Sequence, residues 1–169
     1  MTTIAHEQIA EHAFAEHEHR EIASGVDRIH DVAGFVGSAA APETSLAITE
    51  ILDWVEMVLE PHANWEDRWL YPQIDSLAGT AWATKLMTFE HEQIRVLTRK
   101  LRVARELLDR DHSQALQSKL RATLYGLDAL LRAHIEREER FLLPLLEGQR
   151  SAPAAPPSVP PARSAVAAR

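Results

Sequence analysis

Cysteine is absent from the 169-residue chain, which excludes disulfide scaffolds, cysteine-based zinc sites, iron–sulfur clusters and cysteine nucleophiles. The sequence also has no run of roughly 18 apolar residues, so we expect no membrane-spanning helix. Its first residues lack the basic start and the apolar core of a signal peptide. These absences together predict a cytoplasmic protein with no membrane partner.

Positive charge is scarce as well, because 18 lysines and arginines stand against 25 aspartates and glutamates, a net charge of −7. Nucleic-acid-binding proteins typically carry an excess of basic residues, so we expect no nucleic-acid partner. Hydrophobic residues make up 46% and charged residues 25% of the chain, which is typical of a globular protein. The length is that of one ordinary domain.

Long β-branched runs are missing, only six glycines interrupt the chain, and residues that favour helices predominate. The pattern predicts one helix over residues 4–35, a second from Thr44 or Ser45 to Tyr71–Pro72, a third from a Thr80 cap to residue 110, and a fourth from His112 or Ser113 to Glu147, with Gly148 as its C-cap. Pro61 is expected to kink the second helix.

Four long helices joined by short loops predict an all-α fold, an up-down-up-down four-helix bundle, over residues 1–149. Residues 150–169 are different in composition, since five prolines and many alanines follow Gln149. A segment of this kind lacks the apolar residues for a core. We therefore expect a disordered C-terminal tail.

An internal repeat relates the two halves at an offset of 72 residues. The repeated segments are Glu18-His19-x-x-Ile22 with Glu90-His91-x-x-Ile94, and Leu59-x-x-His62-x-x-x-Glu66-x-Arg68-x-Leu70-x-Pro72 with Leu131-x-x-His134-x-x-x-Glu138-x-Arg140-x-Leu142-x-Pro144. In each half, 43 positions separate the first histidine from the second. The bundle is therefore predicted to consist of two similar helical hairpins.

Histidine and glutamate recur on the apolar stripe of this repeat, at helical steps of three and four residues. A carboxylate in a bundle interior is unfavourable by several kcal/mol without a partner, whereas a metal ion would compensate it. Neutral imidazole and ionised carboxylate are natural ligands of iron, manganese and zinc. The predicted ligands are His19, His62, Glu66, His91, His134 and Glu138. Four histidines and two carboxylates suit two ions, with each carboxylate able to bridge them.

The paired Glu-His-x-x-Ile and His-x-x-x-Glu-x-x-x-Leu-x-Pro segments resemble the hemerythrin-like, or HHE cation-binding, domain over residues 10–149. The resemblance implies a four-helix bundle that holds two non-heme iron ions, bridged by two carboxylates and an oxo or hydroxo group. It assigns the bridging role to Glu66 and Glu138. Manganese or zinc would suit the same ligand types.

The sequence differs from the oxygen carriers of that family in two ways. They place a second histidine one turn from the ligand of the third helix, where this chain has Met87 and Arg95 around His91. They also take the last carboxylate five residues after its histidine, which here is Glu139, with Asp67 as its repeat mate. The four-residue spacing is preferred, because a carboxylate five residues after the histidine lies about 140° around the helix from it. Asp67 and Glu139 nevertheless stay open as replacements for the predicted carboxylates.

Several other residues bear on the choice of ligands and on the surroundings of the metals. His17 competes with His19 as a ligand, although only His19 has a repeat mate. Tyr71 and Tyr125 could reach a bound ligand, but neither is assigned to the site. An apolar shell is expected around the metals from Trp65, Trp69, Phe141 and Leu142. The ferritin-like alternative requires Glu-x-x-His on two helices, and Thr88 stands where the second copy needs its glutamate.

The expected function is that of a di-iron protein which binds or reacts with a small diatomic or peroxide ligand, such as O2, NO or hydrogen peroxide, in sensing, storage or stress protection. One alternative is a di-iron oxidase or peroxidase that consumes this ligand catalytically. Another is an iron-responsive regulatory module, in which metal loading orders the bundle for a partner protein. Nothing in the sequence resembles a phosphate-binding loop or a serine triad.

Overall fold

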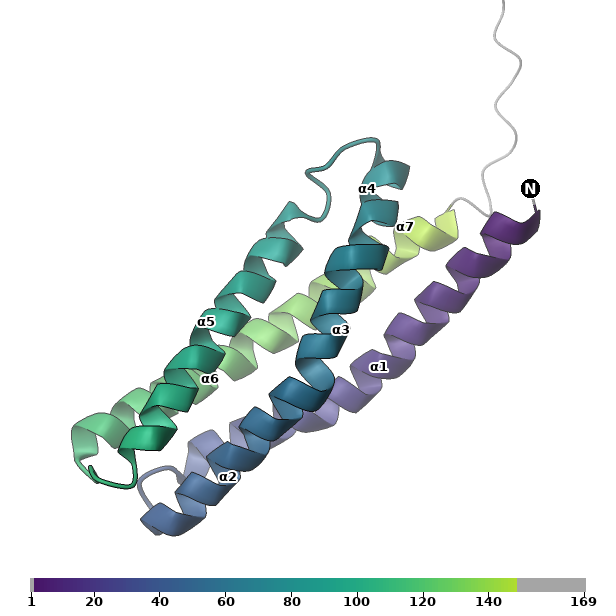
Figure 1. The fold of residues 1–169 in the computed structure, drawn as a ribbon. Helices are drawn as coiled ribbons and strands as arrows, with labels where there is room; N and C mark the ends of the chain where they lie inside the picture. Colours follow the sequence, from purple (N-terminus) through teal and green to yellow (C-terminus); the bar gives the residue numbers. More distant parts are fainter. Residues whose placement is uncertain (1, 149–169) are drawn as a thin grey trace, which may run out of the picture.

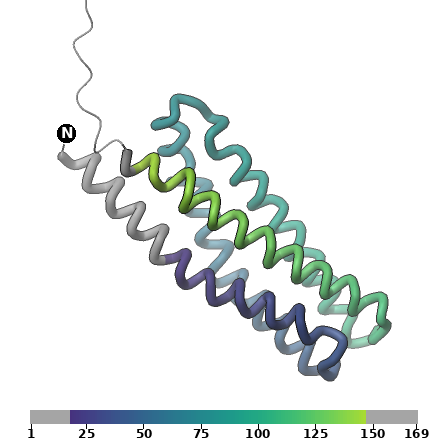
Figure 2. The backbone as a smooth tube through the Cα atoms, turned by 180° about the vertical axis from the view of Figure 1, so that it is seen from behind, coloured from purple at the N-terminus to yellow at the C-terminus, as the bar shows by residue number. Residues whose placement is uncertain are grey.

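A computed structural model describes residues 2–148 of the chain, and the side chains of residues 18–146. It confirms the four-helix bundle, with no strand in the described part (Figure 1). Each long helix packs against two neighbours, so the second lies between the first and the third, and the fourth between the third and the first (Figure 2). This is the predicted up-down-up-down order. No helix in the described part is long and apolar enough to span a membrane, and the predicted tail lies outside the described residues.

The second and fourth long helices are each divided by short π-helical turns. The first long helix is α1 (Thr2–Phe35) and the third is α5 (Lys85–Leu107). The second consists of α2 (Ala41–Trp54), η1 (Val55–Leu59), α3 (Glu60–Trp65), η2 (Glu66–Leu70) and α4 (Tyr71–Ala78). The fourth consists of α6 (Gln114–Arg137), η3 (Glu138–Leu142) and α7 (Leu143–Gly148).

The N-cap of the second long helix was predicted at Thr44 or Ser45, four or five residues too late. The helix begins at Ala41 and its N-cap is Ala40, so Thr44 and Ser45 lie inside it. Pro42 explains the earlier start, because a proline in the first turn has no N–H to leave unpaired and its φ already suits a helix. Within this first turn, the hydroxyl of Thr44 donates a hydrogen bond back to the carbonyl of Ala40 (3.2 Å).

The connection between the second and third helices also differs from the prediction. The second helix continues past Pro72 and ends at Gly79, whose φ of +68° is readily adopted by glycine. Thr80 caps no helix, because α5 begins only after Thr84. The carboxylate of Asp75 accepts hydrogen bonds from both the N–H and the hydroxyl of Thr84 (3.1 Å each), which holds this loop against the helix end.

The third helix ends at Leu107, three residues before the predicted limit, with turns following it. The predicted cap of the fourth helix is confirmed at Ser113, whose hydroxyl accepts a hydrogen bond from the N–H of Leu116 (3.3 Å). Gly148 is the last residue of α7.

Three prolines lie inside these helices, and each comes directly after a π-turn. The N–H groups of Glu60, Tyr71 and Leu143 each donate to a carbonyl five residues earlier, and the next residue is proline every time. A proline has no N–H to donate, and its ring collides with the carbonyl four residues before it in a regular α-helix. The wider turn accommodates the proline, so the second helix continues past Pro72, where the sequence predicted its end. The kink expected at Pro61 stays a prediction.

Two apolar clusters fill the bundle. The larger one lies toward the α1–α2 and α5–α6 loops and includes Ile22, Leu59, Ile94 and Leu131. The smaller one lies toward the α4–α5 loop and includes Leu70, Met87 and Leu142. Between these positions on all four long helices lie buried histidines and glutamates. The polar layer is therefore enclosed by apolar side chains along the bundle axis.

Candidate metal centre

All six predicted ligands meet in this polar layer. His19 comes from α1, His62 from α3, Glu66 from η2, His91 from α5, His134 from α6 and Glu138 from η3. Each side chain is buried, and the two glutamates are fully inaccessible to solvent. Every long helix thus contributes at least one nitrogen or oxygen donor to the same enclosed space.

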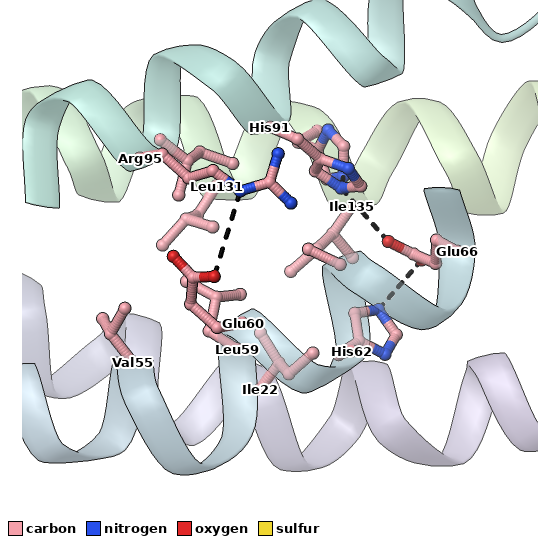
Figure 3. Close-up of a pocket in the computed structure, with 13 residues that line it drawn as sticks. Ile22, Val55, Leu59, Glu60, His62, Glu66, His91, Arg95, Leu131 and Ile135 are labelled. Atoms are coloured by element: carbon pink, nitrogen blue, oxygen red, sulfur yellow. Dashed lines mark hydrogen bonds and ion pairs between the residues drawn. The ribbon is translucent and has the colours of Figure 1, made fainter. Parts of the chain in front are cut away.

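The donors form two groups that share one carboxylate. The first group is His19, His62, Glu66 and Glu138, and the second is Glu66, His91 and His134. The ligand atoms within each group lie within 4.8 Å of one another, as is needed to surround one ion. Glu66 joins the groups because its Oε1 lies 2.9 Å from Nε2 of His62 and its Oε2 lies 3.2 Å from Nε2 of His91 (Figure 3).

Glu138 is arranged differently from Glu66. Its Oε2 faces both neighbouring histidines, at 3.2 Å from Nε2 of His19 and 3.7 Å from Nε2 of His134. Its Oε1 instead accepts a hydrogen bond from the hydroxyl of Tyr71. This glutamate therefore presents one oxygen to the histidines, whereas Glu66 presents both.

Each of the four histidines has a carboxylate at its other ring nitrogen. Nδ1 of His62 lies 3.0 Å from Glu18, and Nδ1 of His134 lies 3.1 Å from Glu90. The remaining two pairs are His91 with Asp67 (2.9 Å) and His19 with Glu139 (3.3 Å). With the proton on Nδ1, these contacts orient the rings and leave each Nε2 lone pair directed into the cluster.

These contacts bear on the carboxylates that the sequence left open. Asp67 and Glu139 contact the outward nitrogens of the histidines, whereas Glu66 and Glu138 face the inward nitrogens. The roles of Glu18 and Glu90 were missed, although both belong to the repeated Glu-His pair that contains His19 and His91. That repetition was the available signal. The side chain of His17, the alternative to His19, lies outside the described residues.

The buried carboxylates control the protonation of the histidines. Burial alone would lower the pKa of His19, but the adjacent carboxylates of Glu138 and Glu66 raise it to about 10. Burial opposes protonation of His91 too, yet Asp67 and Glu66 raise its pKa to about 9. The pKa of His62 is raised for the same reason. Protons thus stabilise the metal-free cluster, and a metal ion would have to displace them.

The two central glutamates are shifted in opposite directions. Despite its burial, Glu66 has a pKa well below the ordinary value, because it faces three imidazoles. Burial and the charge of Glu66 raise the pKa of Glu138. Burial and the charges of the same two glutamates strongly raise the pKa of Tyr71, so its phenol keeps its proton and acts as a donor to Glu138.

Several polar atoms of the cluster have no hydrogen-bond partner among the described residues. They are Nε2 of His19, both carboxylate oxygens of Glu66 and Oε2 of Glu138. Unsatisfied buried polar groups are rare in folded proteins and demand an explanation. All four atoms are lone-pair donors that point into the cluster, so the residues fit one or more cations of the kind that nitrogen and oxygen ligands bind.

The expected apolar shell is only partly correct. Leu142 is buried and Trp65 is half-buried near His62. Trp69 and Phe141 were wrongly predicted, since 58% and 60% of these side chains are exposed. They occupy equivalent positions within the two π-turns η2 and η3, on the outer side of their helices. Water is instead excluded by the aliphatic residues of the two clusters above and below the site.

The hemerythrin family model, described as the hemerythrin HHE cation-binding domain, matches residues 12–146 of the chain. No curated protein and no solved structure matches the chain. The matched range includes all six residues of the cluster and most of the four-helix bundle. The bundle, the repeat and the buried histidine–glutamate cluster agree with this match, and the chain therefore belongs to the hemerythrin HHE cation-binding domain family.

Proposed function

We propose that this protein holds two iron ions in the bundle and uses them to bind or react with a small diatomic or peroxide ligand, such as O2, NO or hydrogen peroxide. The proposed ligands are His19, His62, Glu66, His91, His134 and Glu138. The observation that carries the proposal is the pair of buried donor groups that share Glu66. A carboxylate common to both groups could bridge two adjacent ions.

Iron is chosen over zinc because of the family and because the proposed chemistry needs a redox-active metal. The cluster contains imidazole and carboxylate and no sulfur, which suits iron, manganese and zinc alike. Two iron ions, when bound, supply the one-electron changes that O2, NO and peroxide chemistry needs. The chain itself contributes fixed donor positions, oriented rings and a dry environment.

A small cavity beside the cluster supports a small ligand (Figure 3). Its volume is about 20 Å³, which is enough for a molecule of water or diatomic size. Aliphatic side chains surround it, and four of the proposed ligands lie at one end: His62, Glu66, His91 and His134. The small volume of this cavity favours a diatomic or peroxide ligand over a bulky organic substrate.

Arg95 closes the opposite side of this cavity. Its guanidinium lies 3.9 Å from the carboxylate of Glu60. It lies 3.2 Å from the carboxylate of Asp67 and 3.2 Å from the amide oxygen of Asn64. Arg95 is, with Met87, one of the two positions one turn from His91 where the oxygen carriers of the family could have their further histidine. Arg95 is thus anchored to the residue that orients His91, and its positive charge lies beside the space that a ligand would enter.

The proposal is tested by measuring metal content per chain after expression with added iron. We expect about two irons in the wild type and loss of this iron in a His62→Ala, His134→Ala double variant. His112→Ala is the matched control, because this exposed histidine lies away from the cluster. Optical spectra of the reduced protein mixed with O2, NO or hydrogen peroxide would then identify the ligand.

Two results would contradict the proposal. One is a wild-type protein that retains no stoichiometric transition metal. The other is metal that the double variant retains as well as the wild type, because it would then be bound elsewhere. If the protein retained zinc or manganese in preference to iron, the assignment of the six ligands would stand and the proposed di-iron chemistry would be contradicted.

A further inference from the structure

The carboxylate contacts at the outer nitrogens of the four histidines follow the 72-residue repeat. The contact of His62 with Glu18 matches that of His134 with Glu90, and the contact of His91 with Asp67 matches that of His19 with Glu139. Tyr71 breaks this correspondence, because its repeat mate is Leu143. Both residues follow a π-turn that begins at a central glutamate, but only Tyr71 carries a polar atom.

The π-turn explains how Tyr71 reaches the cluster. Its N–H donates to the carbonyl of Glu66, five residues earlier, which brings residue 71 around to the side of the helix that Glu66 occupies. The side chain is buried, and its ring stacks on His91 with centroids 5.5 Å apart and planes 22° apart. Its hydroxyl lies 3.5 Å from Nε2 of His91 and donates a hydrogen bond to Oε1 of Glu138.

The hydrogen bond from Tyr71 occupies the carboxylate oxygen by which Glu138 differs from Glu66. Glu66 offers one oxygen to His62 and the other to His91, so it belongs to both donor groups. Glu138 offers only Oε2, which belongs to the first group alone, because Oε1 is engaged by Tyr71. The first group therefore has four protein donors and the second has three.

The cavity provides an independent sign of the same asymmetry. Every member of the second group, Glu66, His91 and His134, lines the cavity. Of the three residues specific to the first group, only His62 lines the cavity, whereas His19 and Glu138 do not. The position with fewer protein donors is thus the one beside the space that admits a small molecule.

We propose that Tyr71 is a positioning residue that holds Glu138 on the first metal position, makes the two metal ions inequivalent, and leaves the second ion open to an external ligand. This inference rests on the proposed di-iron function. The phenol acts through Glu138 as a hydrogen-bond donor and is not itself a metal ligand.

The test compares the diferric wild type with Tyr71→Phe, after metal analysis has shown two irons per chain in each. Mössbauer spectroscopy should resolve two distinct iron sites in the wild type. In Tyr71→Phe, Oε1 of Glu138 is released and can reach the second ion, so the two signals should converge. Tyr125→Phe is the matched control, because this half-exposed phenol contacts His30 and is not part of the cluster.

Azide titration of the same proteins gives a second readout. Azide should bind the wild type and Tyr125→Phe equally, and bind Tyr71→Phe about tenfold more weakly, as expected when one hydrogen bond no longer keeps a coordination position open. Tyr71→Leu, which copies the repeat mate, should behave as Tyr71→Phe does.

Three results would overturn the inference while leaving the di-iron function intact. They are equivalent irons in the wild type, unchanged inequivalence and azide affinity in Tyr71→Phe, and a tyrosinate-to-iron charge-transfer band in the wild type, which would make the phenol a ligand. A wild type without two irons would overturn both proposals, and the metal analysis would reveal that case first.

Discussion

Replacing Glu66 by leucine should stabilise the metal-free protein and abolish its stabilisation by metal. The carboxylate of Glu66 is fully buried, and neither of its oxygens has a hydrogen-bond partner among the described residues. In the metal-free protein the imidazoles of His19, His62 and His91 compensate its charge. A buried ionic group of this kind is often no more favourable for folding than an apolar side chain of similar volume. The same side chain is proposed to join both metal positions, so its removal should have opposite effects with and without metal.

The magnitude follows from the surroundings of Glu66. Replacing a buried ionic group by an apolar one of similar volume is neutral or stabilising by about 1–4 kcal/mol, or roughly 2–16 °C in Tm for a chain of this size. The usual penalty for stranding the partner charge is reduced here. Removing Glu66 takes away one of the carboxylates that raise the pKa of His19, His62 and His91, so these imidazoles release their protons more readily.

Metal should reverse the order of stability. A ligand present at about one hundred times its Kd stabilises the folded state by about 2.7 kcal/mol, which is roughly 5–11 °C in Tm here. The wild type should gain this increment on addition of ferrous iron under anaerobic conditions. Glu66→Leu should gain almost nothing, since both donor groups lose a shared member.

The assay is thermal unfolding followed by far-UV circular dichroism, with a chelator and with ferrous iron. Glu56→Leu is the matched control, because this exposed glutamate lies on the same long helix outside the cluster. It should respond to metal as the wild type does. If chelated Glu66→Leu unfolds well below the chelated wild type, Glu66 is a structural residue satisfied without metal, and the reasoning is refuted.

Three further predictions concern the residues around the cluster. In the folded metal-free protein the pKa of His19 is raised from 6.5 to about 10, and that of His91 to about 9. The urea midpoint of this form should therefore be highest below about pH 6.5 and fall as pH rises through 9–10. The metal-loaded protein, whose imidazoles are neutral, should not show this loss. Asp67→Ala removes the carboxylate that orients His91 and should weaken metal affinity about 10–100-fold in a competition titration. Gly25→Ala would place a Cβ 2.1 Å from the indole of Trp54 and should destabilise the protein by about 1–3 kcal/mol, without changing metal content.

Glu139, the repeat mate of Asp67, and Gly126, a second glycine inside a helix, provide controls for these predictions. Glu139→Ala should weaken metal binding less than Asp67→Ala, because 49% of the Glu139 side chain is exposed against 25% for Asp67. Gly126→Ala meets its nearest neighbour at an ordinary 3.9 Å and should be neutral or stabilising by up to about 1 kcal/mol. A metal-free protein whose stability rises between pH 7 and 10, or equal losses in both glycine variants, would contradict the arguments given.

The helical fold and the six clustered residues were predictable from the sequence, because both depend on local periodicity. His62 and Glu66 share a helix face through a spacing of four residues, and the repeat supplied the same pair at His134 and Glu138. Polar residues at equivalent core positions indicated a common partner for them. The helix limits were less predictable, since a proline normally ends a helix. That Pro72 does not end one depends on the π-turn before it.

The three-dimensional packing of the four helices decided what lies around each donor. Which carboxylate faces the outer nitrogen of a histidine depends on residues 24 to 120 positions apart in the chain. The same holds for the hydroxyl of Tyr71, which the π-turn at Glu66 brings to Glu138 on another helix. A local pattern reports the direction of a side chain from its own helix, whereas the atom that it meets is set by the packing of the others.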